Sequence, residues 1–151
     1  MPSFALITDW NIPVPIERCW FSILDTQAWS VWWDYVEKVE ELERGDSLGL
    51  NNKRRYVWQT CLPYRLVFEL QVTEVRPYQL IRFMANGDLQ GEGCCRFIPS
   101  EKNTIIQFEW KVQTTKAWMN LCPFLVTPIF IWNHSRVMLN GEKSLIKRLS
   151  D

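Results

Sequence analysis

The feature of the sequence that most constrains its fold is a change of hydrophobic period in the last third of the chain. Up to about residue 115, apolar residues recur at every second position over long runs, most clearly over 64–75 and 104–115. In these runs side chains such as Phe68 and Phe108 alternate with polar residues, which is typical of strands with one buried face. After Thr127 the spacing becomes three and four, the period of a helix.

The C-terminal spacing predicts one long helix. Thr127 and Pro128 would form a cap followed by a proline at the first helical position. A helix of roughly 22 residues would span about 33 Å and cross a small domain. As an alternative, helical turns begin near Ala117, and Pro123 and Pro128 then bend the element. One stripe of this helix would hold Phe130, His134, Val137, Met138, Gly141, Leu145 and Leu149.

The elements before this helix complete an α+β pattern. Residues 4–12 predict a strand, and Pro15 suits the first turn of a short helix over 16–24, with a second short helix over 28–33. Residues 34–44 fit either a helix or a strand, because Val36, Val39 and Leu42 stand three apart. Further strands are expected over 54–60, 64–75, 79–85, 91–99 and 104–115, with a turn at Leu62 and Pro63. The length favours a single domain over residues 1–151.

Charge and cysteine content exclude several classes of function. The 17 basic residues balance the 17 acidic ones, and the basic run Lys53–Arg55 fits a solvated turn, so no nucleic-acid partner is expected. One histidine and no C-x-x-C motif leave no metal site, and five unpaired cysteines favour a reducing compartment. The apolar stretch Met119–Trp132 is too short and too broken for a transmembrane segment, and no signal peptide precedes it. We therefore expect a soluble, cytoplasmic protein.

Short motifs along nearly the whole chain carry a resemblance to a known superfamily. They are Trp10 with Pro13–Trp20, Trp29–Trp33, Leu62–Leu66, Gly87–Gly91 with Gly93, Trp110–Val112, and Asn133–Met138 followed by Gly141 and Leu145. The chain resembles the SRPBCC superfamily of START-like, helix-grip proteins, and within it the polyketide cyclase/dehydrase and lipid-transport-like group. The resemblance implies a curved antiparallel sheet of about seven strands around the C-terminal helix, with an apolar cavity between them. These proteins share no catalytic signature, so whether the chain is an enzyme stays open.

Aromatic residues make up 14% of the chain, and many are candidates for the cavity wall. Strand parity points seven of them toward one interior, where tryptophan and tyrosine suit a pocket for flat or greasy molecules. Plain core packing is the alternative, and it is favoured for the tryptophans near the N-terminus. The candidate ligand-binding residues are Tyr56, Trp58, Tyr64, Phe68, Phe97, Phe108 and Trp110 from the strands, with Phe130, His134 and Met138 from the helix.

His134 is the one candidate catalytic residue. It lies on the apolar stripe, with Gly141 leaving room beside it, and should point at the sheet. It is either a core histidine satisfied by one hydrogen bond or a polar anchor or acid/base for a ligand carbonyl or hydroxyl.

Other polar residues have structural interpretations. Asp88 follows Asn86-Gly87 and suits a turn, while Arg82, Glu92 and Glu109 are expected to face solvent. If Arg82 faced inward, it could hold a carboxylate or phosphate. Gly87, Gly91 and Gly93 precede no helix, so they form no nucleotide-binding loop.

The leading hypothesis is non-covalent binding of a small hydrophobic or aromatic molecule, lipid or polyketide-like, in an internal cavity without metal or cofactor. A second hypothesis is a cyclase or dehydratase that uses His134 as acid/base. A third is a stress or regulatory interaction domain acting through Phe124–Trp132. Burial against the sheet is the default for that segment, but exposure would make it a flap, a membrane contact or a homodimer patch.

Overall fold

The computed structural model describes residues 3–61 and 63–150, so Leu62 of the predicted turn lies outside the described residues. The chain begins with β1 (Ser3–Ile12), α1 (Ile16–Leu24), a short 3₁₀ turn η1 (Thr26–Ala28), α2 (Trp29–Trp32), β2 (Val36–Glu43) and β3 (Lys53–Gln59). It continues with β4 (Arg65–Arg76), β5 (Leu80–Gly87), β6 (Leu89–Ser100), β7 (Asn103–Thr114), α3 (Ala117–Asn120) and α4 (Pro123–Ser150).

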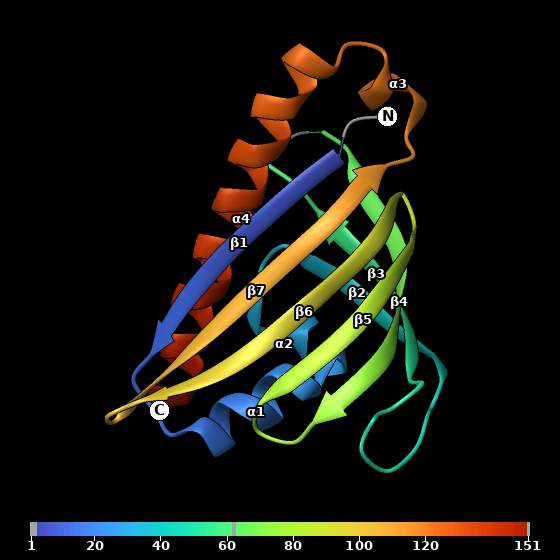
Figure 1. The fold of residues 1–151 in the computed structure, drawn as a ribbon. Coiled ribbons are helices and arrows are strands. Elements are labelled where there is room, and N and C mark those ends of the chain that lie inside the picture. The colour runs from blue at the N-terminus through green and yellow to red at the C-terminus, as the bar shows by residue number, and fades with distance from the viewer. Residues whose placement is uncertain (1–2, 62, 151) are drawn as a thin grey trace.

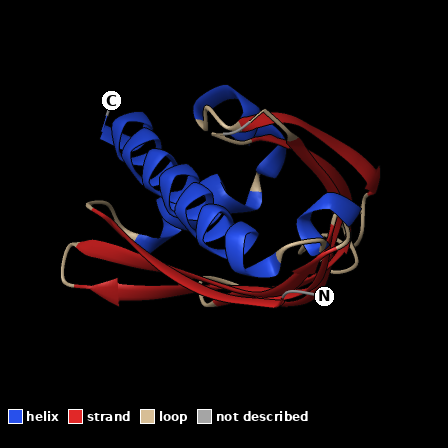
Figure 2. Cartoon of the chain, turned by 90° about the horizontal axis from the view of Figure 1, so that it is seen from above, coloured by secondary structure: helices blue, strands red, loops and turns tan. Residues whose placement is uncertain are grey.

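The seven strands form one antiparallel sheet that curls around α4 (Figures 1 and 2). The strand order is β1-β7-β6-β5-β4-β3-β2, so each strand from β2 to β7 pairs with the next in sequence. β1 pairs with β7 and forms the edge opposite β2. Phe4 lies opposite Val112 and Trp10 opposite Ile106, which places the buried residues of β1 and β7 on the same face. The predicted α+β helix-grip fold, with two short helices after the first strand, is confirmed.

The ambiguous segment 34–44 contains a strand, β2, that pairs with β3. The register shifts between Val36 and Lys38, and again between Glu41 and Glu43. A bulge adds one residue to a strand and so converts a spacing of two into a spacing of three. The first shift lets Val36 and Val39 both pack on the core, which explains the helix-like spacing in the sequence.

The long helix α4 begins at Pro123, and Pro128 lies inside it. The predicted start at Thr127 and Pro128 is therefore wrong, and the alternative with helical turns from Ala117 is closer, because α3 begins there. Pro128 is tolerated inside α4 for two reasons. A proline removes only one backbone N–H from the helical hydrogen bonds, and Val126, two residues earlier, packs against the core. The 28 residues of α4 span about 42 Å at 1.5 Å per residue.

The segment Phe124–Trp132 is not buried as a whole, so the default expectation for it is wrong. Phe130 faces the sheet and is buried, whereas Phe124 and Trp132 are 76% and 50% exposed. A helix turns only one side toward the sheet, so a continuously apolar run must leave its other side in solvent.

A cluster of tryptophans joins α2 to α4 and β1. Trp10 and Trp33 are almost fully buried, with ring centroids 5.1 Å apart. A Cβ atom on Gly141 would lie 2.5 Å from Trp33 Cε2 and 2.7 Å from Trp10 Cη2. The rings of Trp10 and Trp33 therefore occupy the space beside Gly141. The expectation from the sequence that this space lies beside His134 is wrong.

Candidate ligand cavity

The concave face of the sheet encloses a cavity of about 320 Å³. Its inner walls are aromatic and aliphatic side chains from the sheet, from α2 and from α4. Its outer end is bordered by the end of α1 and by exposed residues of the 44–49 loop. The apolar wall includes Ile23, Trp29, Trp33, Tyr56, Trp58, Phe68, Leu70, Val72, Ile81, Phe83, Cys95, Phe108, Trp110 and Met138.

A second chamber of about 80 Å³ lies toward the first half of α4. Phe130, Asn133 and His134 line it together with Leu6 and Leu66. Four side chains, Trp58, Phe68, Trp110 and Met138, line both spaces and therefore form the wall between them.

The structure brings eight of the ten sequence-predicted site residues to these two spaces. Tyr56, Trp58, Phe68, Phe108, Trp110 and Met138 line the larger cavity, while Phe130 and His134 line the smaller one. Tyr64 lies elsewhere and packs edge-on against Trp118 at 5.1 Å. Phe97 packs against Trp20 under α1 at 5.0 Å. Both follow the parity of their strands but lie beyond the ends of the cavity.

Two cavity-lining tryptophans were assigned to the core from the sequence. Trp29 and Trp33 are buried, as expected, and they also line the larger cavity. Helical spacing alone could not place them there, because their position depends on how α2 crosses the open side of the sheet.

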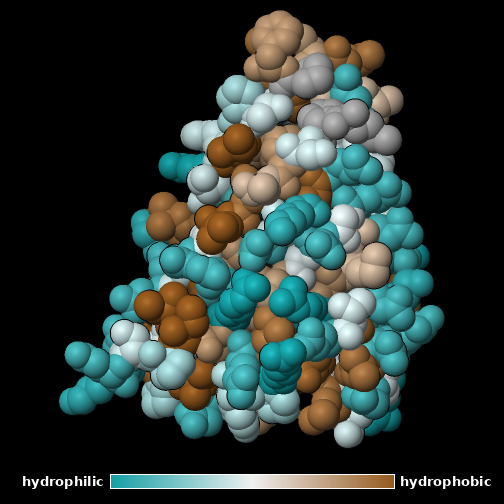
Figure 3. All heavy atoms as spheres, in the orientation of Figure 1, coloured by the Kyte–Doolittle hydropathy of each residue, from teal (hydrophilic) through white to brown (hydrophobic). Residues whose placement is uncertain are grey.

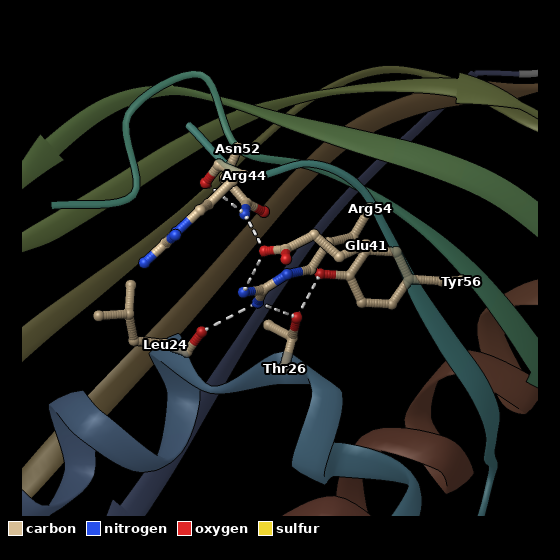
Figure 4. A network of polar contacts seen from close by, with 7 residues as sticks. All are labelled: Leu24, Thr26, Glu41, Arg44, Asn52, Arg54 and Tyr56. Atoms are coloured by element: carbon tan, nitrogen blue, oxygen red, sulfur yellow. Dashed lines mark hydrogen bonds and ion pairs between the residues drawn. The ribbon is translucent and has the colours of Figure 1, made fainter. Parts of the chain in front are cut away.

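Arg54 forms a polar network at the outer end of the cavity, which Figure 4 shows from close by. Its Nη1 donates hydrogen bonds to the carbonyl oxygen of Leu24 at 3.2 Å and to Thr26 Oγ1 at 2.5 Å. Its Nη2 lies 3.4 Å from Glu41 Oε1. The side chain is only 16% exposed, so the solvated turn expected for Lys53–Arg55 is wrong for Arg54.

The same network fixes the loop after β2. Asn52 Nδ2 donates to Glu41 Oε1 at 2.9 Å and to the carbonyl oxygen of Arg44 at 3.0 Å. Tyr56 Oη donates to Thr26 Oγ1 at 2.9 Å, and burial raises the pKa of the Tyr56 phenol. The strand parity that singled out Tyr56 and Trp58 also applies to Arg54, so the sequence contained a signal for this residue.

His134 is partly buried beside the smaller chamber, and its buried Nε2 atom has no hydrogen-bond partner among the described residues. Burial lowers the pKa of the imidazole to about 4, so the side chain is neutral at pH 7. The indole Nε1 of Trp58 is also buried without a partner within the described chain. Two polar atoms without a partner among the described residues thus belong to side chains that line the smaller chamber.

We expect His134 to make the protein less stable in mild acid. The pKa is about 4 in the folded chain and about 6.5 when unfolded, so the unfolded state binds the proton more readily between these values. The contribution is complete above pH ~6.5 and decreases as the pH falls, reaching a loss of about 2 kcal/mol at pH ~5. Urea unfolding of the wild type and of His134→Gln at pH 7 and pH 5 checks this. Equal losses in the two proteins would contradict it.

The other polar candidates lie outside the cavity. Asp88 follows β5, and its Oδ2 accepts a hydrogen bond from the Val67 N–H of β4 at 2.8 Å, so its role is structural but toward the neighbouring strand and not within its own turn. Arg82 is on the outer face and pairs with Glu74 at 3.1 Å, so it does not reach the cavity. Glu92 is exposed.

Glu109 also faces outward, and its hydrogen bond from Arg96 lowers the pKa of the Glu109 carboxyl. The described residues contain no cluster of three histidine, cysteine or acidic side chains arranged to hold a metal ion. All five cysteines are free, and burial raises the pKa of the Cys95 thiol on the cavity wall well above its usual value.

The chain is similar to known proteins in its fold, but its sequence identity to them is low. No protein-family profile and no curated protein matches the chain. Among solved structures, TTHA0849 from Thermus thermophilus superposes with a TM-score of 0.77 at 19% identity, over 96% of this chain and 99% of that one. The Zhui aromatase/cyclase from a Streptomyces species gives a TM-score of 0.77 at 12% identity, over 97% and 93%.

A START superfamily protein from Mycobacterium smegmatis gives a TM-score of 0.76 at 15% identity, over 97% of both chains. The chain therefore has the same helix-grip fold as these START superfamily and aromatase/cyclase structures, as the resemblance implied.

Proposed function

We propose that the protein binds a small hydrophobic or aromatic molecule non-covalently in the cavity between the sheet and α4. The observation that carries this proposal is the cavity of about 320 Å³ with an aromatic wall. A space of this size lies at the lower end of the range for ligand pockets, which are mostly apolar with a few placed polar groups.

The lining defines the chemistry of the ligand. Flat apolar groups would stack on rings such as Trp58, Phe108 and Trp110, while a polar group would lie at the outer end beside Arg54. If the two chambers join, a ligand hydroxyl could accept from Trp58 Nε1–H and donate to the neutral His134 Nε2. The resemblance to START-like proteins supports a lipid or polyketide-like ligand.

The test uses N-phenyl-1-naphthylamine, a neutral aromatic probe whose fluorescence increases in apolar surroundings. Val72→Trp would fill part of the cavity, because Val72 lines it, and we expect the probe to bind about tenfold more weakly. Val67→Trp on the outward face of the same strand is the matched control, and its affinity should stay within about twofold of the wild type. Equal binding by Val72→Trp would contradict the proposal. Native mass spectrometry of the purified protein then identifies a co-purifying ligand.

A second candidate function is that of a polyketide cyclase or dehydratase. It is favoured by the structural likeness to an aromatase/cyclase and by the unpartnered Nε2 of His134. With a pKa of about 4, His134 would act as a base at neutral pH. Conversion of a linear poly-β-ketone to a cyclic product by the wild type, and its loss in His134→Gln, would support this function. Binding without conversion would favour the first.

A further inference from the structure

A large apolar surface covers the end of the molecule where α3 leads into α4. Figure 3 shows hydrophobic atoms gathered at this end, which is the top of Figure 1. Its members, here called the tip, are Trp118, Leu121, Phe124, Leu125, Ile129 and Trp132, each 47% to 82% exposed. At roughly 200 Å² for a full side chain, these fractions amount to about 700 Å². Monomeric proteins rarely expose so large a patch.

The tip is continuous along one side of α4. Leu125, Ile129 and Trp132 are separated by four and three residues and therefore share the outward stripe of the helix. Phe130 and Val137 occupy the opposite stripe and are buried against the sheet. The first half of α4 is thus apolar on both sides, and only the inner side is covered by the described chain.

The charged residues of the segment 116–141, which carries the tip, are both basic: Lys116, which pairs with Asp88 at 3.4 Å, and Arg136. The sequence contains no acidic residue between Glu109 and Glu142. The guanidinium of Arg136 lies 5.8 Å from the ring centre of Trp132, one turn along the same stripe. The one carboxylate of α4, Glu142, lies further along the helix and already accepts a hydrogen bond from the Asn11 N–H at 2.8 Å.

We propose that the tip docks on the surface of a lipid bilayer that carries anionic headgroups. Leucine, isoleucine and phenylalanine would enter the acyl boundary, and Trp118 and Trp132 would lie at headgroup depth, where indole rings are favoured. Arg136 would contact lipid phosphates or carboxylates. No helix in the described residues is long and apolar enough to cross a membrane, so the contact would be peripheral.

A second copy of the chain fits the tip less well. A symmetric pair would bring two copies of Arg136 to one interface, and the tip contains no acidic partner for either. The loop 44–52 at the outer end of the cavity lies at the far end of the molecule from α3 (Figure 1), so docking would leave that end open. The docking proposal does not depend on the proposed ligand.

The experiment is sedimentation of the full chain with two kinds of vesicle, one of phosphatidylcholine alone and one of phosphatidylcholine containing about one-quarter phosphatidylserine. We expect the wild type to sediment with these vesicles, and Leu121→Glu/Phe124→Glu to bind at least about tenfold more weakly. Val31→Glu is the matched control, because Val31 on α2 is exposed to the same 76% as Phe124 but lies outside the tip. Its binding should stay within about twofold of the wild type. We expect Arg136→Gln to weaken binding only to the vesicles that contain phosphatidylserine.

Three results would overturn the proposal. The first is no sedimentation of the wild type with either vesicle, and the second is an equal loss in Val31→Glu and the tip variant. The third is a dimer in light scattering that Leu121→Glu/Phe124→Glu converts to a monomer while vesicle binding is absent, which would assign the tip to a second copy of the chain.

Discussion

Replacement of Trp33 by alanine is expected to lower the free energy of unfolding by about 5 kcal/mol. The side chain is 2% exposed, and its ring lies 4.8 Å from that of Trp58 and 5.1 Å from that of Trp10. Its Nε1 donates a hydrogen bond to the carbonyl oxygen of Val137 at 3.0 Å, so alanine would also remove a buried side-chain hydrogen bond to α4. This amount is close to the whole stability of many small domains.

Urea unfolding followed by circular dichroism measures the effect. Trp132→Ala is the matched control, since this tryptophan is half exposed, and its cost should stay below about 1 kcal/mol. Trp33→Phe keeps a ring but loses the hydrogen bond, and we expect a loss of about 2 kcal/mol, which remains measurable if the alanine variant does not fold. A cost for Trp33→Ala no greater than that of Trp132→Ala would show that the aromatic cluster is not what joins α2 to α4.

The sheet and the long helix were predictable because each follows from the regular spacing of hydrophobic residues along a short stretch of sequence. On β4 and β7 a shift by one residue would turn Phe68 or Phe108 to solvent, so the alternation determines the register. The segment of β2 was ambiguous because a bulge displaces the alternation, and no local signal marks the bulge. The start of α4 was misplaced because Pro128 is tolerated inside the helix, although prolines are usually found at helix starts.

The cavity was predictable only in part, for a different reason. Parity tells which side of a strand a residue is on, but not how far along the strand the cavity extends. Tyr64 and Phe97 have the correct parity and lie beyond its ends, where Trp118 and Trp20 pack on them. The position of Arg54 was not predicted, because a charged residue between Lys53 and Arg55 is expected to be exposed to solvent. The alternation along the strand, however, places Arg54 on the same face as Tyr56.

Arg54→Met is expected to lower the free energy of unfolding by about 3 kcal/mol. Methionine keeps the length of the stem, so the change removes mainly the guanidinium that joins the end of α1 to β2 and β3. It leaves the carbonyl oxygen of Leu24 and the carboxylate of Glu41 without this donor in a partly buried site. The loss is smaller than that expected for Trp33→Ala, because Arg54 retains some contact with water.

Arg55→Met is the matched control, because it removes the same group from the next residue of β3. Arg55 is 44% exposed and forms ion pairs with Glu40 and Glu69, which in solvent contribute at most about 1 kcal/mol. Urea unfolding of the two variants should therefore differ by about 2 kcal/mol. The same variants separate stability from access to the cavity, since N-phenyl-1-naphthylamine should bind and dissociate faster when the end of α1 is no longer tied to β3. Equal unfolding free energies for Arg54→Met and Arg55→Met would mean that the network of Figure 4 does not hold the outer end of the cavity together.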